Sequence, residues 1–248
     1  MKIISFSSVD RTLLTYPTME LIRLEGFLSI GVGEKSCIGR WEGQNYIPCD
    51  HTEAPVCQQC KIFNACAICK GSCLKDEKTC LEDHVVYLAM FRPDILKIGV
   101  SKSSRFERRL REQGADVGAI IASCPDGEIA RKIEHALQQN YGLKNSVRSS
   151  KKINLEKELN LDVWDAAKEQ LNARNEIKLN YLNKNLWMRP LPLDDAIYGN
   201  VIGLKGRMLI VENKNTLYVY DLNNLLGAQI TSVATSHRQI SLSSFRIM

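Results

Sequence analysis

Apolar and polar side chains alternate along much of the first 36 residues. The stretch Ile22–Glu25 alternates, Gly26 interrupts it, and Leu28–Val32 alternates again. Successive side chains of a strand point to opposite faces of a sheet, so this two-residue period is typical of half-buried strands. The pattern therefore predicts a β-rich N-terminal part over residues 1–36.

Residues 83–150 have the pattern of a compact α/β module. Apolar runs predict strands at Val85–Ala89, Ile95–Val100 and Val117–Ala122, the first two joined by a turn at Arg92–Asp94. A module of this kind alternates strands with helices that cover the sheet.

Two helices are expected around the third of these strands. Ser104 and Glu107 have the spacing of a capping box, so the first helix should start there and end at Gly114. Asp126 should cap the second helix, which closes at Tyr141-Gly142. Its apolar face would be formed by Ile129, Ile133, Ala136 and Leu137.

The rest of the chain predicts a helical segment and a second β-rich part. A helix or helix pair is expected within residues 154–187, with Val163, Trp164, Ala167 and Leu171 on one stripe. Strands are expected at Gly199–Val211 and Thr216–Tyr220, with a turn at Asn213–Asn215 between them. The chain is thus expected to be an α+β protein of five parts: residues 1–36, 37–82, 83–150, 151–190 and 191–248.

The cysteines are concentrated in residues 37–82. Eight of the nine lie there, and they include two Cys-x-x-Cys pairs, in which both sulfurs of one tight turn can reach the same ion. The simplest division gives two tetrahedral sites, one formed by Cys37, Cys49, Cys57 and Cys60 and the other by Cys66, Cys69, Cys73 and Cys80. His51 and His84 are substitute ligands, and an interleaved pairing is a further alternative.

Structural zinc is the expected occupant, because the segment has few apolar residues to order it and nothing suggests an open catalytic position. An iron–sulfur cluster and free buried thiols are the alternatives. A disulfide scaffold would require export, and the sequence has neither a signal-peptide core nor an apolar run of bilayer length. We therefore expect a cytoplasmic protein without a membrane partner, in which the separate Cys124 is a packing residue.

The distribution of charge is more informative than the formal net charge of +5. Each zinc tetrathiolate would carry about −2, so two of them would reduce the total to roughly +1. One basic cluster comprises Lys102, Arg105, Arg108, Arg109 and Arg111, and a second, in the acid-free stretch from His135 to Leu155, comprises Lys144, Arg148, Lys151 and Lys152. Such clusters suit a phosphate backbone, and a solvated basic surface is the alternative.

The α/β module carries Val85-Val86-Tyr87 on its first strand, Lys97-Ile98-Gly99 on its second, and then Arg109 and Glu134 on its two helices. This order resembles that of the GIY-YIG nuclease superfamily. Arg105 and Arg108 are rivals for the arginine position, and Asn145 matches an asparagine that often follows. Two positions depart from the pattern, because Val85 replaces the first glycine and Lys97 replaces the second tyrosine.

The resemblance implies a site for phosphodiester hydrolysis with magnesium as a cofactor. Tyr87 would act as the base or orient water, Arg109 would stabilise the transition state, and Glu134 would hold the magnesium ion. Lys97 would contact the phosphate, or would occupy the place of the metal and abolish catalysis. The plain structural alternatives are that Tyr87 packs in the sheet and that Glu134 is a solvent-facing partner of Arg131.

The chain also resembles, over most of its length, an uncharacterised zinc-containing family in which such a module lies between β-rich ends. The shared features are the Cys-x-x-Cys pair, the helix end Glu112–Ala115 and the strand Ile202–Gly206, and they imply no activity. Three functions are open: a catalytically silent nucleic-acid-binding module acting on RNA or ribonucleoprotein, an active endonuclease cleaving DNA or RNA, and a zinc-based protein–protein adaptor. We expect nucleic-acid binding, which the first two share.

Overall fold

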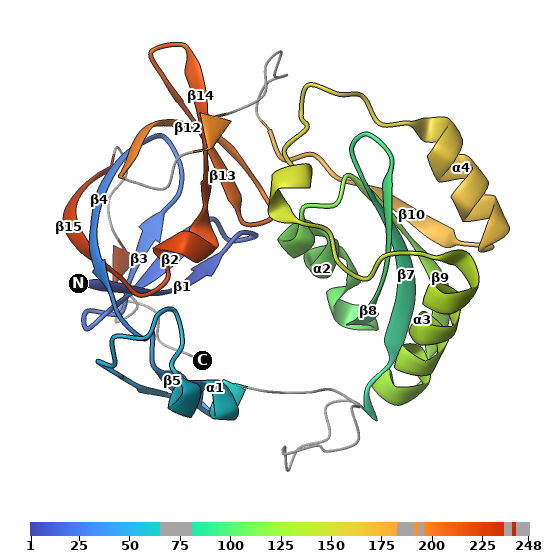
Figure 1. Ribbon diagram of the computed structural model, residues 1–248, viewed down its shortest axis with the longest axis horizontal. Coiled ribbons are helices and arrows are strands. Elements are labelled where there is room, and N and C mark those ends of the chain that lie inside the picture. Colours follow the sequence, from blue (N-terminus) through green and yellow to red (C-terminus); the bar gives the residue numbers. More distant parts are fainter. Residues whose placement is uncertain (65–80, 183–190, 193–195, 236–239, 242–248) are drawn as a thin grey trace. The chain divides into compact units, whose positions relative to one another are not determined.

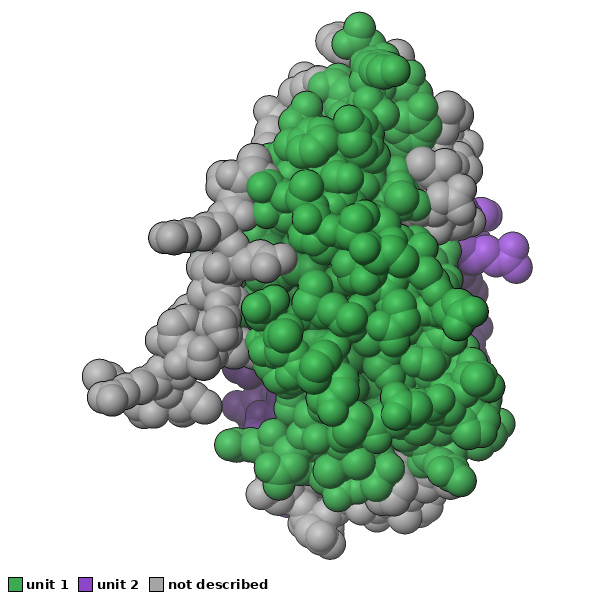
Figure 2. Space-filling view, turned by 90° about the vertical axis from the view of Figure 1, so that its left-hand side faces the viewer, with its two compact units in different colours: residues 1–65, 182–184, 190–248 green, residues 66–181, 185–189 purple. Residues whose placement is uncertain are grey.

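The computed structural model describes residues 1–64, 81–182, 191–192, 196–235 and 240–241 of the chain. They form two compact units, each built on its own sheet (Figure 1). Unit 1 comprises residues 1–65, 182–184 and 190–248, and unit 2 comprises residues 66–181 and 185–189. Figure 2 shows unit 1 as one continuous body. No helix of the described residues is long and apolar enough to cross a membrane.

Strands from both β-rich ends of the chain build a single ten-stranded sheet in unit 1. In spatial order they are β11 (Leu191–Pro192), β14 (Thr216–Asp221), β13 (Met208–Asn213), β12 (Ile197–Lys205), β4 (Phe27–Lys35), β15 (Ala228–Thr235), β1 (Lys2–Ser7), β2 (Thr12–Tyr16), β3 (Glu20–Arg23) and β16 (Ile240–Ser241). Because β4 lies between β12 and β15, the sheet requires both ends of the chain.

The core of unit 1 joins strands that lie far apart in the sheet order. Leu13 of β2 and Ile22 of β3 belong to the same buried cluster as Leu209 and Val211 of β13. The sheet must therefore curve strongly, so that one face encloses the core (Figure 1). The alternating burial of β4, in which Leu28 and Ile30 are buried, agrees with the alternation predicted for Leu28–Val32.

The single strand expected at Gly199–Val211 is wrong. The chain turns at Gly206-Arg207, so that β12 and β13 form a hairpin in which Lys205 pairs with Met208. Gly206 has a φ of 57°, the left-handed conformation that tight hairpin turns require. Buried apolar residues on both sides of the turn hid it in the sequence pattern.

Unit 2 contains a four-stranded antiparallel sheet flanked by helices. The strand order is β10 (Arg174–Lys178), β9 (Val117–Cys124), β7 (His84–Phe91) and β8 (Ile95–Lys102), and the helices are α2 (Phe106–Gln113), α3 (Gly127–Tyr141) and α4 (Leu161–Gln170). Leu88 packs with Trp164 of α4 and Val86 with Ala130 of α3, whereas Tyr87 meets Phe106 of α2. Because successive side chains of β7 face opposite ways, α2 covers one face and α3 and α4 the other (Figure 1).

The predicted helix ends are confirmed where a cap fixes them. The Asp126 side chain accepts a hydrogen bond of 2.7 Å from a backbone N–H in the first turn of α3, and Gly114 and Gly142 end α2 and α3 in the left-handed conformation. The capping box at Ser104 is wrong. Residues Ser103–Arg105 form a 3-10 turn instead, and α2 follows it without a side-chain cap.

The helical segment expected over residues 154–187 is present only in part. Among the described residues of this segment the α-helix is α4, which ends where Asn172 takes a φ of 48°. The chain then continues as β10 beside β9. The strand went unrecognised because its five residues are mostly polar and exposed, as an edge strand allows.

Candidate functional site

Four cysteines of unit 1 form one cluster. Cys37, Cys49, Cys57 and Cys60 have Sγ atoms that all lie within 4.8 Å of one another. They come from the end of β4, from the residues after a small hairpin of β5 (Arg40–Glu42) and β6 (Asn45–Ile47), and from the start of α1 (Gln58–Asn64). These are the four residues that the spacing predicts for the first metal site.

The geometry of the cluster fits a zinc ion. A tetrahedral site with Zn–S bonds of about 2.3 Å has sulfur–sulfur distances of roughly 3.8 Å, and the Sγ atoms of Cys49 and Cys57 are 3.9 Å apart. The backbone N–H groups of Gly39 and Cys57 lie 3.4 and 3.3 Å from the Cys37 Sγ. Donors for a thiolate are therefore already in place.

The electrostatics of the four sulfurs also favour a bound cation. The backbone N–H of Cys60 is the main cause that lowers the pKa of Cys57 to about 7, whereas burial raises the pKa of Cys60 to about 12. Four thiolates at this separation would repel one another strongly. A bound metal ion would supply the opposing charge, so metal binding should release protons.

Glycine is required at position 39 for the cluster to form. The φ of Gly39 is 76°, and a Cβ there would lie 2.4 Å from the Ile47 carbonyl oxygen. The nearby Tyr46 hydroxyl donates a hydrogen bond of 2.5 Å to the Ile38 carbonyl. The hairpin of β5 and β6 thus closes directly over the turn that follows Cys37.

Of the other candidate ligands, His51 and His84 do not join this cluster in the described part of the chain. Cys66, Cys69, Cys73 and Cys80 lie outside the described residues, so a second zinc site stays a prediction. His51 is exposed, and the Nδ1 of His84, in unit 2, lies 2.6 Å from the Glu82 carbonyl oxygen. Cys124 packs against Val86 and Ala130 in the core of unit 2, as expected of a packing residue.

The residues of the predicted nuclease-like site lie close together in unit 2. Tyr87 pairs with Gly99 across β7 and β8, and the Lys97 Nζ lies 5.4 Å from the centroid of the Tyr87 ring. Arg109 of α2 and Glu134 of α3 act electrostatically on both side chains. The fold therefore gathers the two strand residues and the two helix residues in one neighbourhood.

Lys97 is a nearly buried cation without a carboxylate partner in the described part of the chain. It is 7% exposed, and no carboxylate of the described residues forms an ion pair with its ammonium group. Burial, followed by the repulsion of Arg109, lowers the pKa of Lys97 to about 8. A buried charge without a partner costs free energy, so this ammonium group is suited to an incoming anion.

Tyr87 is completely buried, and its hydroxyl has no hydrogen-bond partner among the described residues. Burial raises its pKa, although Arg109 and Gln113 lie near enough to oppose that rise. The buried Oε1 of Gln113 likewise lacks a hydrogen-bond partner in the described part of the chain. Position 99 must be glycine, because a Cβ there would lie 2.5 Å from the Tyr87 hydroxyl and 2.9 Å from the Lys97 Nζ.

Glu134 is paired with a cation of its own helix. Its carboxylate lies 2.6 Å from the Arg131 guanidinium, and the residue is only 7% exposed. The pairing agrees with the plain structural alternative, but the carboxylate is buried and not solvent-facing. The opposing charge beside Glu134 is thus a guanidinium and not the Lys97 ammonium group.

Three arginines of the first basic cluster share one carboxylate. Guanidinium nitrogens of Arg105, Arg108 and Arg109 lie 2.8, 3.3 and 3.5 Å from Glu112. The three guanidinium groups therefore gather around one carboxylate on the surface of α2. Arg109 belongs both to this group and to the surroundings of Tyr87 and Lys97.

The other two cations of the first cluster are paired one to one. Arg111 lies 2.8 Å from Glu107, and Lys102 lies 2.7 Å from Glu82. Exposed pairs of this kind contribute little net charge, although a phosphate can compete for their cations.

The second basic cluster contains both exposed side chains and one, Lys152, that contacts other residues of unit 2. The Lys152 Nζ donates a hydrogen bond of 2.7 Å to the Gln113 carbonyl and lies 5.1 Å from the centroid of the Phe91 ring. The backbone carbonyl of Lys144 accepts a hydrogen bond of 2.9 Å from the Ile98 N–H, which holds this segment beside β8. The exposed members are Lys144, Arg148 and Lys151, and the candidate Asn145 next to Lys144 is also exposed.

Sequence reasoning missed two residues, Gln113 and Lys2. Gln113 ends α2 beside Tyr87 and has no distinctive spacing. Lys2 is a 3% exposed lysine whose ammonium group reaches the backbone of two of the cysteines. A charged residue within the otherwise apolar stretch Met1–Ile4 was the available signal for it.

Residues 33–230 match the family described as "protein of unknown function (DUF2797)". The chain belongs to this family. The matched residues include the four-cysteine cluster and all of the nuclease-like residues of unit 2, whereas Lys2 precedes them. The DUF2797 match neither supports nor contradicts a relationship to the GIY-YIG superfamily. No curated protein and no solved structure matches the chain.

Proposed function

We propose that this protein binds the phosphate groups of nucleic acid through unit 2 and does not hydrolyse them. The observation that carries the proposal is Lys97, a nearly buried ammonium group without a carboxylate partner in the described part of the chain. A lysine that only stabilised the fold would be expected to have such a partner, because an unpaired buried charge is costly. A phosphate oxygen would supply the missing negative charge.

The arginines that share Glu112 extend this site over the surface of α2. Arg109 lies near Tyr87 and Lys97, and Arg105 and Arg108 continue from it through their common carboxylate. A strand whose phosphates follow these guanidinium groups would place one phosphate near Lys97. Planar guanidinium groups bind phosphate through two parallel hydrogen bonds, which favours arginine at such positions.

The absence of hydrolysis is inferred from Glu134 and Tyr87. A magnesium ion requires a carboxylate free to bind it, and Arg131 already occupies the Glu134 carboxylate. A general base must lose its proton near neutral pH, whereas burial raises the pKa of Tyr87 above its ordinary value of 10.0. Zinc would have a structural role in unit 1, because all four cluster ligands are cysteines.

An active metal-dependent endonuclease is the second candidate. It is favoured by one observation, namely that the unpaired Tyr87 hydroxyl lies in the same neighbourhood as Lys97, Arg109 and Glu134. A substrate that displaced Arg131 would free Glu134 for a metal ion. The two candidates differ in whether a bound strand is cut.

Fluorescence anisotropy with labelled single- and double-stranded RNA and DNA would test both candidates. The zinc-loaded wild type should bind, with an affinity that falls steeply as salt rises, and the same mixtures with magnesium or manganese should contain no cleaved strand. Lys97→Met should weaken binding by about tenfold, the loss of one hydrogen bond to a charged group. RNA bound more tightly than DNA would support the expected RNA or ribonucleoprotein partner.

Lys132→Met is the matched control for Lys97→Met. Lys132 is an exposed lysine of α3 that pairs with Glu128 at 2.8 Å, so its removal changes the net charge by the same amount. Equal losses in the two variants would mean that only the overall charge matters and would contradict a site at Lys97. Cleavage by the wild type would establish the endonuclease, and absence of all binding would favour the zinc-based adaptor.

A further inference from the structure

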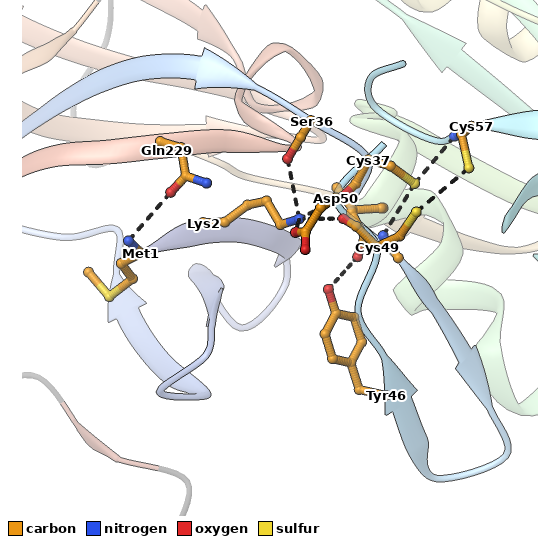
Figure 3. A network of polar contacts seen from close by, with 11 residues as sticks. Met1, Lys2, Ser36, Cys37, Tyr46, Cys49, Asp50, Cys57 and Gln229 are labelled. Carbon is orange, nitrogen blue, oxygen red and sulfur yellow. Dashed lines mark hydrogen bonds and ion pairs between the residues drawn. The ribbon is translucent and has the colours of Figure 1, made fainter. Parts of the chain in front are cut away.

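A buried lysine lies beside the metal cluster in unit 1 and belongs to the N-terminal strand. Lys2 is 3% exposed, and its Nζ lies 2.7 Å from the Cys37 carbonyl oxygen and 2.8 Å from that of Cys49. Its third neighbour is the Ser36 hydroxyl, at 3.3 Å. Figure 3 shows the amine reaching the backbone of both cysteines from β1.

The hydrogen bonds of Lys2 do not neutralise its charge. An ammonium group has three N–H donors, and here the three nearest acceptors are two carbonyls and a hydroxyl, all uncharged. Among the described residues, the carboxylate that forms an ion pair with Lys2 is that of Asp50, 3.8 Å away, and its side chain is 100% exposed. An ion pair with so exposed a partner is worth little and does not offset the burial of a cation.

The metal cluster can supply the missing negative charge. Zinc bound by four thiolates carries a net charge of about −2, and two of the four ligands are the cysteines whose carbonyls Lys2 holds. A second cation, Arg40, pairs with Glu42 at 2.8 Å and also interacts with Cys60. Of these two cations, Lys2 is the one that is buried.

The position of Lys2 is fixed by the sheet. Lys2 pairs with Gln229 of β15 on one side and with Tyr16 of β2 on the other. The Gly227 N–H donates to the Ile3 carbonyl (2.8 Å), and the Ser36 N–H donates to the Gly227 carbonyl (3.0 Å). The end of β4, just before Cys37, is therefore tied to the strand that carries Lys2.

We propose that Lys2 is a positioning residue and internal counter-cation of the metal centre, so that zinc binding and the docking of β1 stabilise each other. A cation that favours the charged, metal-loaded cluster must itself be favoured by that cluster, because such coupling is reciprocal. Loss of zinc would leave the buried Lys2 ammonium group opposed only by the fully exposed Asp50 carboxylate among the described residues, and would loosen β1. The N-terminal strand is in this way part of the metal site, although it lies outside the matched residues 33–230.

The test compares the rate of zinc transfer to a chelator from zinc-loaded full-length variants. Lys2→Met keeps the aliphatic stem but removes the charge and its donors, and it should weaken zinc retention by about 10- to 100-fold, as is usual for residues that support metal ligands. Lys35→Met is the matched control, because Lys35 is an exposed lysine two residues before Cys37. It should change retention by less than about twofold.

A purely structural role for Lys2 predicts a different result. Lys2→Met would then lower the melting temperature equally with and without zinc, whereas the proposal requires the increase caused by zinc to shrink. Equal zinc retention in the Lys2→Met and Lys35→Met variants would overturn the proposal. Asp50→Asn should hold zinc at least as well as the wild type, because it removes a negative charge near Lys2, and faster loss would contradict the role of the Lys2 charge.

Hydrogen exchange on the wild type keeps the proposal testable if Lys2→Met does not fold. Removal of zinc should increase exchange in the peptide that covers β1 more than in the β12–β13 hairpin. The hairpin belongs to the same sheet, but Lys2, which links the sheet to Cys37 and Cys49, lies on β1. Unchanged protection of β1 after zinc removal would show that the strand and the metal are not coupled.

Discussion

The Glu134 carboxylate lies 2.6 Å from the Arg131 guanidinium, three residues earlier on α3. In a nuclease the carboxylate should be free to bind a metal ion, whereas here it is neutralised by its own helix. The same pair reduces the positive charge that an incoming phosphate would meet. The substitution Glu134→Gln therefore has opposite consequences for a nuclease and for a binding module.

Glu134→Gln should tighten nucleic-acid binding by about two- to fivefold, because it removes one negative charge near Lys97 and releases Arg131. Anisotropy titrations at fixed salt would measure the change. Glu128→Gln is the control, since Glu128 is an exposed carboxylate of the same helix and its loss changes the net charge equally. If the wild type cuts nucleic acid and Glu134→Gln does not, the carboxylate holds a metal ion and the binding-module proposal is wrong.

Lys97→Met should stabilise the folded protein although it weakens binding. Burial of the ammonium group opposes folding, so an apolar side chain of similar length should raise the free energy of unfolding by about 1–2 kcal/mol at neutral pH, allowing for partial solvation. Chemical denaturation would measure this value. A lysine that only supports the fold would give the opposite sign, with Lys97→Met less stable than the wild type.

Part of the pH dependence of the free energy of unfolding should come from the titration of Lys97. Its pKa is about 8 in the folded protein and near the ordinary 10.5 when unfolded, so between these values the unfolded chain binds more protons. The free energy of unfolding should therefore rise with pH through that window. Below about pH 8 the buried ammonium group destabilises the folded protein by its full amount. The advantage of Lys97→Met over the wild type should accordingly shrink between about pH 8 and 10. An advantage independent of pH would mean that Lys97 is not desolvated.

Much of the local structure followed from the sequence because single residues determine it. Asp126 and Gly142 mark the ends of α3, and the spacing of Cys37, Cys49, Cys57 and Cys60 identifies one cluster. The curvature of the sheet in unit 1 could not be read, since it depends on pairing between β4 and strands about 170 residues later, such as β12. No local pattern encodes such a partner.

The sequence could indicate which residues of unit 2 to compare, but not how their charges are paired. The order of Tyr87, Lys97, Arg109 and Glu134 along the chain indicated which residues to compare. Side-chain packing in three dimensions buries Lys97 away from every carboxylate partner among the described residues, and it makes Arg131 the partner of Glu134. Lys2 illustrates the same limit, because its two carbonyl partners are 35 and 47 residues away.

Gly99→Ala should disrupt the phosphate site more than its small size suggests. A Cβ at position 99 would lie 2.5 Å from the Tyr87 hydroxyl and 2.9 Å from the Lys97 Nζ, so both groups would have to move. Binding per folded molecule should fall by about tenfold or more. Gly118→Ala is the control: its Cβ would clash with Leu110, on α2, at 2.4 Å. It should lower stability but leave the affinity of the folded protein unchanged.

Cys57→Ser should remove one zinc ion and destabilise unit 1. Cys57 is a buried member of the cluster and receives hydrogen-bond support for its thiolate, so a neutral hydroxyl there breaks the tetrahedral site. Elemental analysis of protein purified without added metal should give about two ions per chain for the wild type, if the second predicted site also forms, and about one fewer for Cys57→Ser.

Cys124→Ser separates the loss of a ligand from the loss of a buried thiol. Cys124 is also a buried cysteine, but it packs in unit 2 with Val86 and Ile98, so this variant should keep the full zinc content. Nucleic-acid binding should survive in Cys57→Ser, because Lys97 and Arg109 belong to unit 2, which has its own sheet and core. Unchanged zinc in Cys57→Ser would show that the four cysteines do not form the metal site, and iron in place of zinc would identify an iron–sulfur centre.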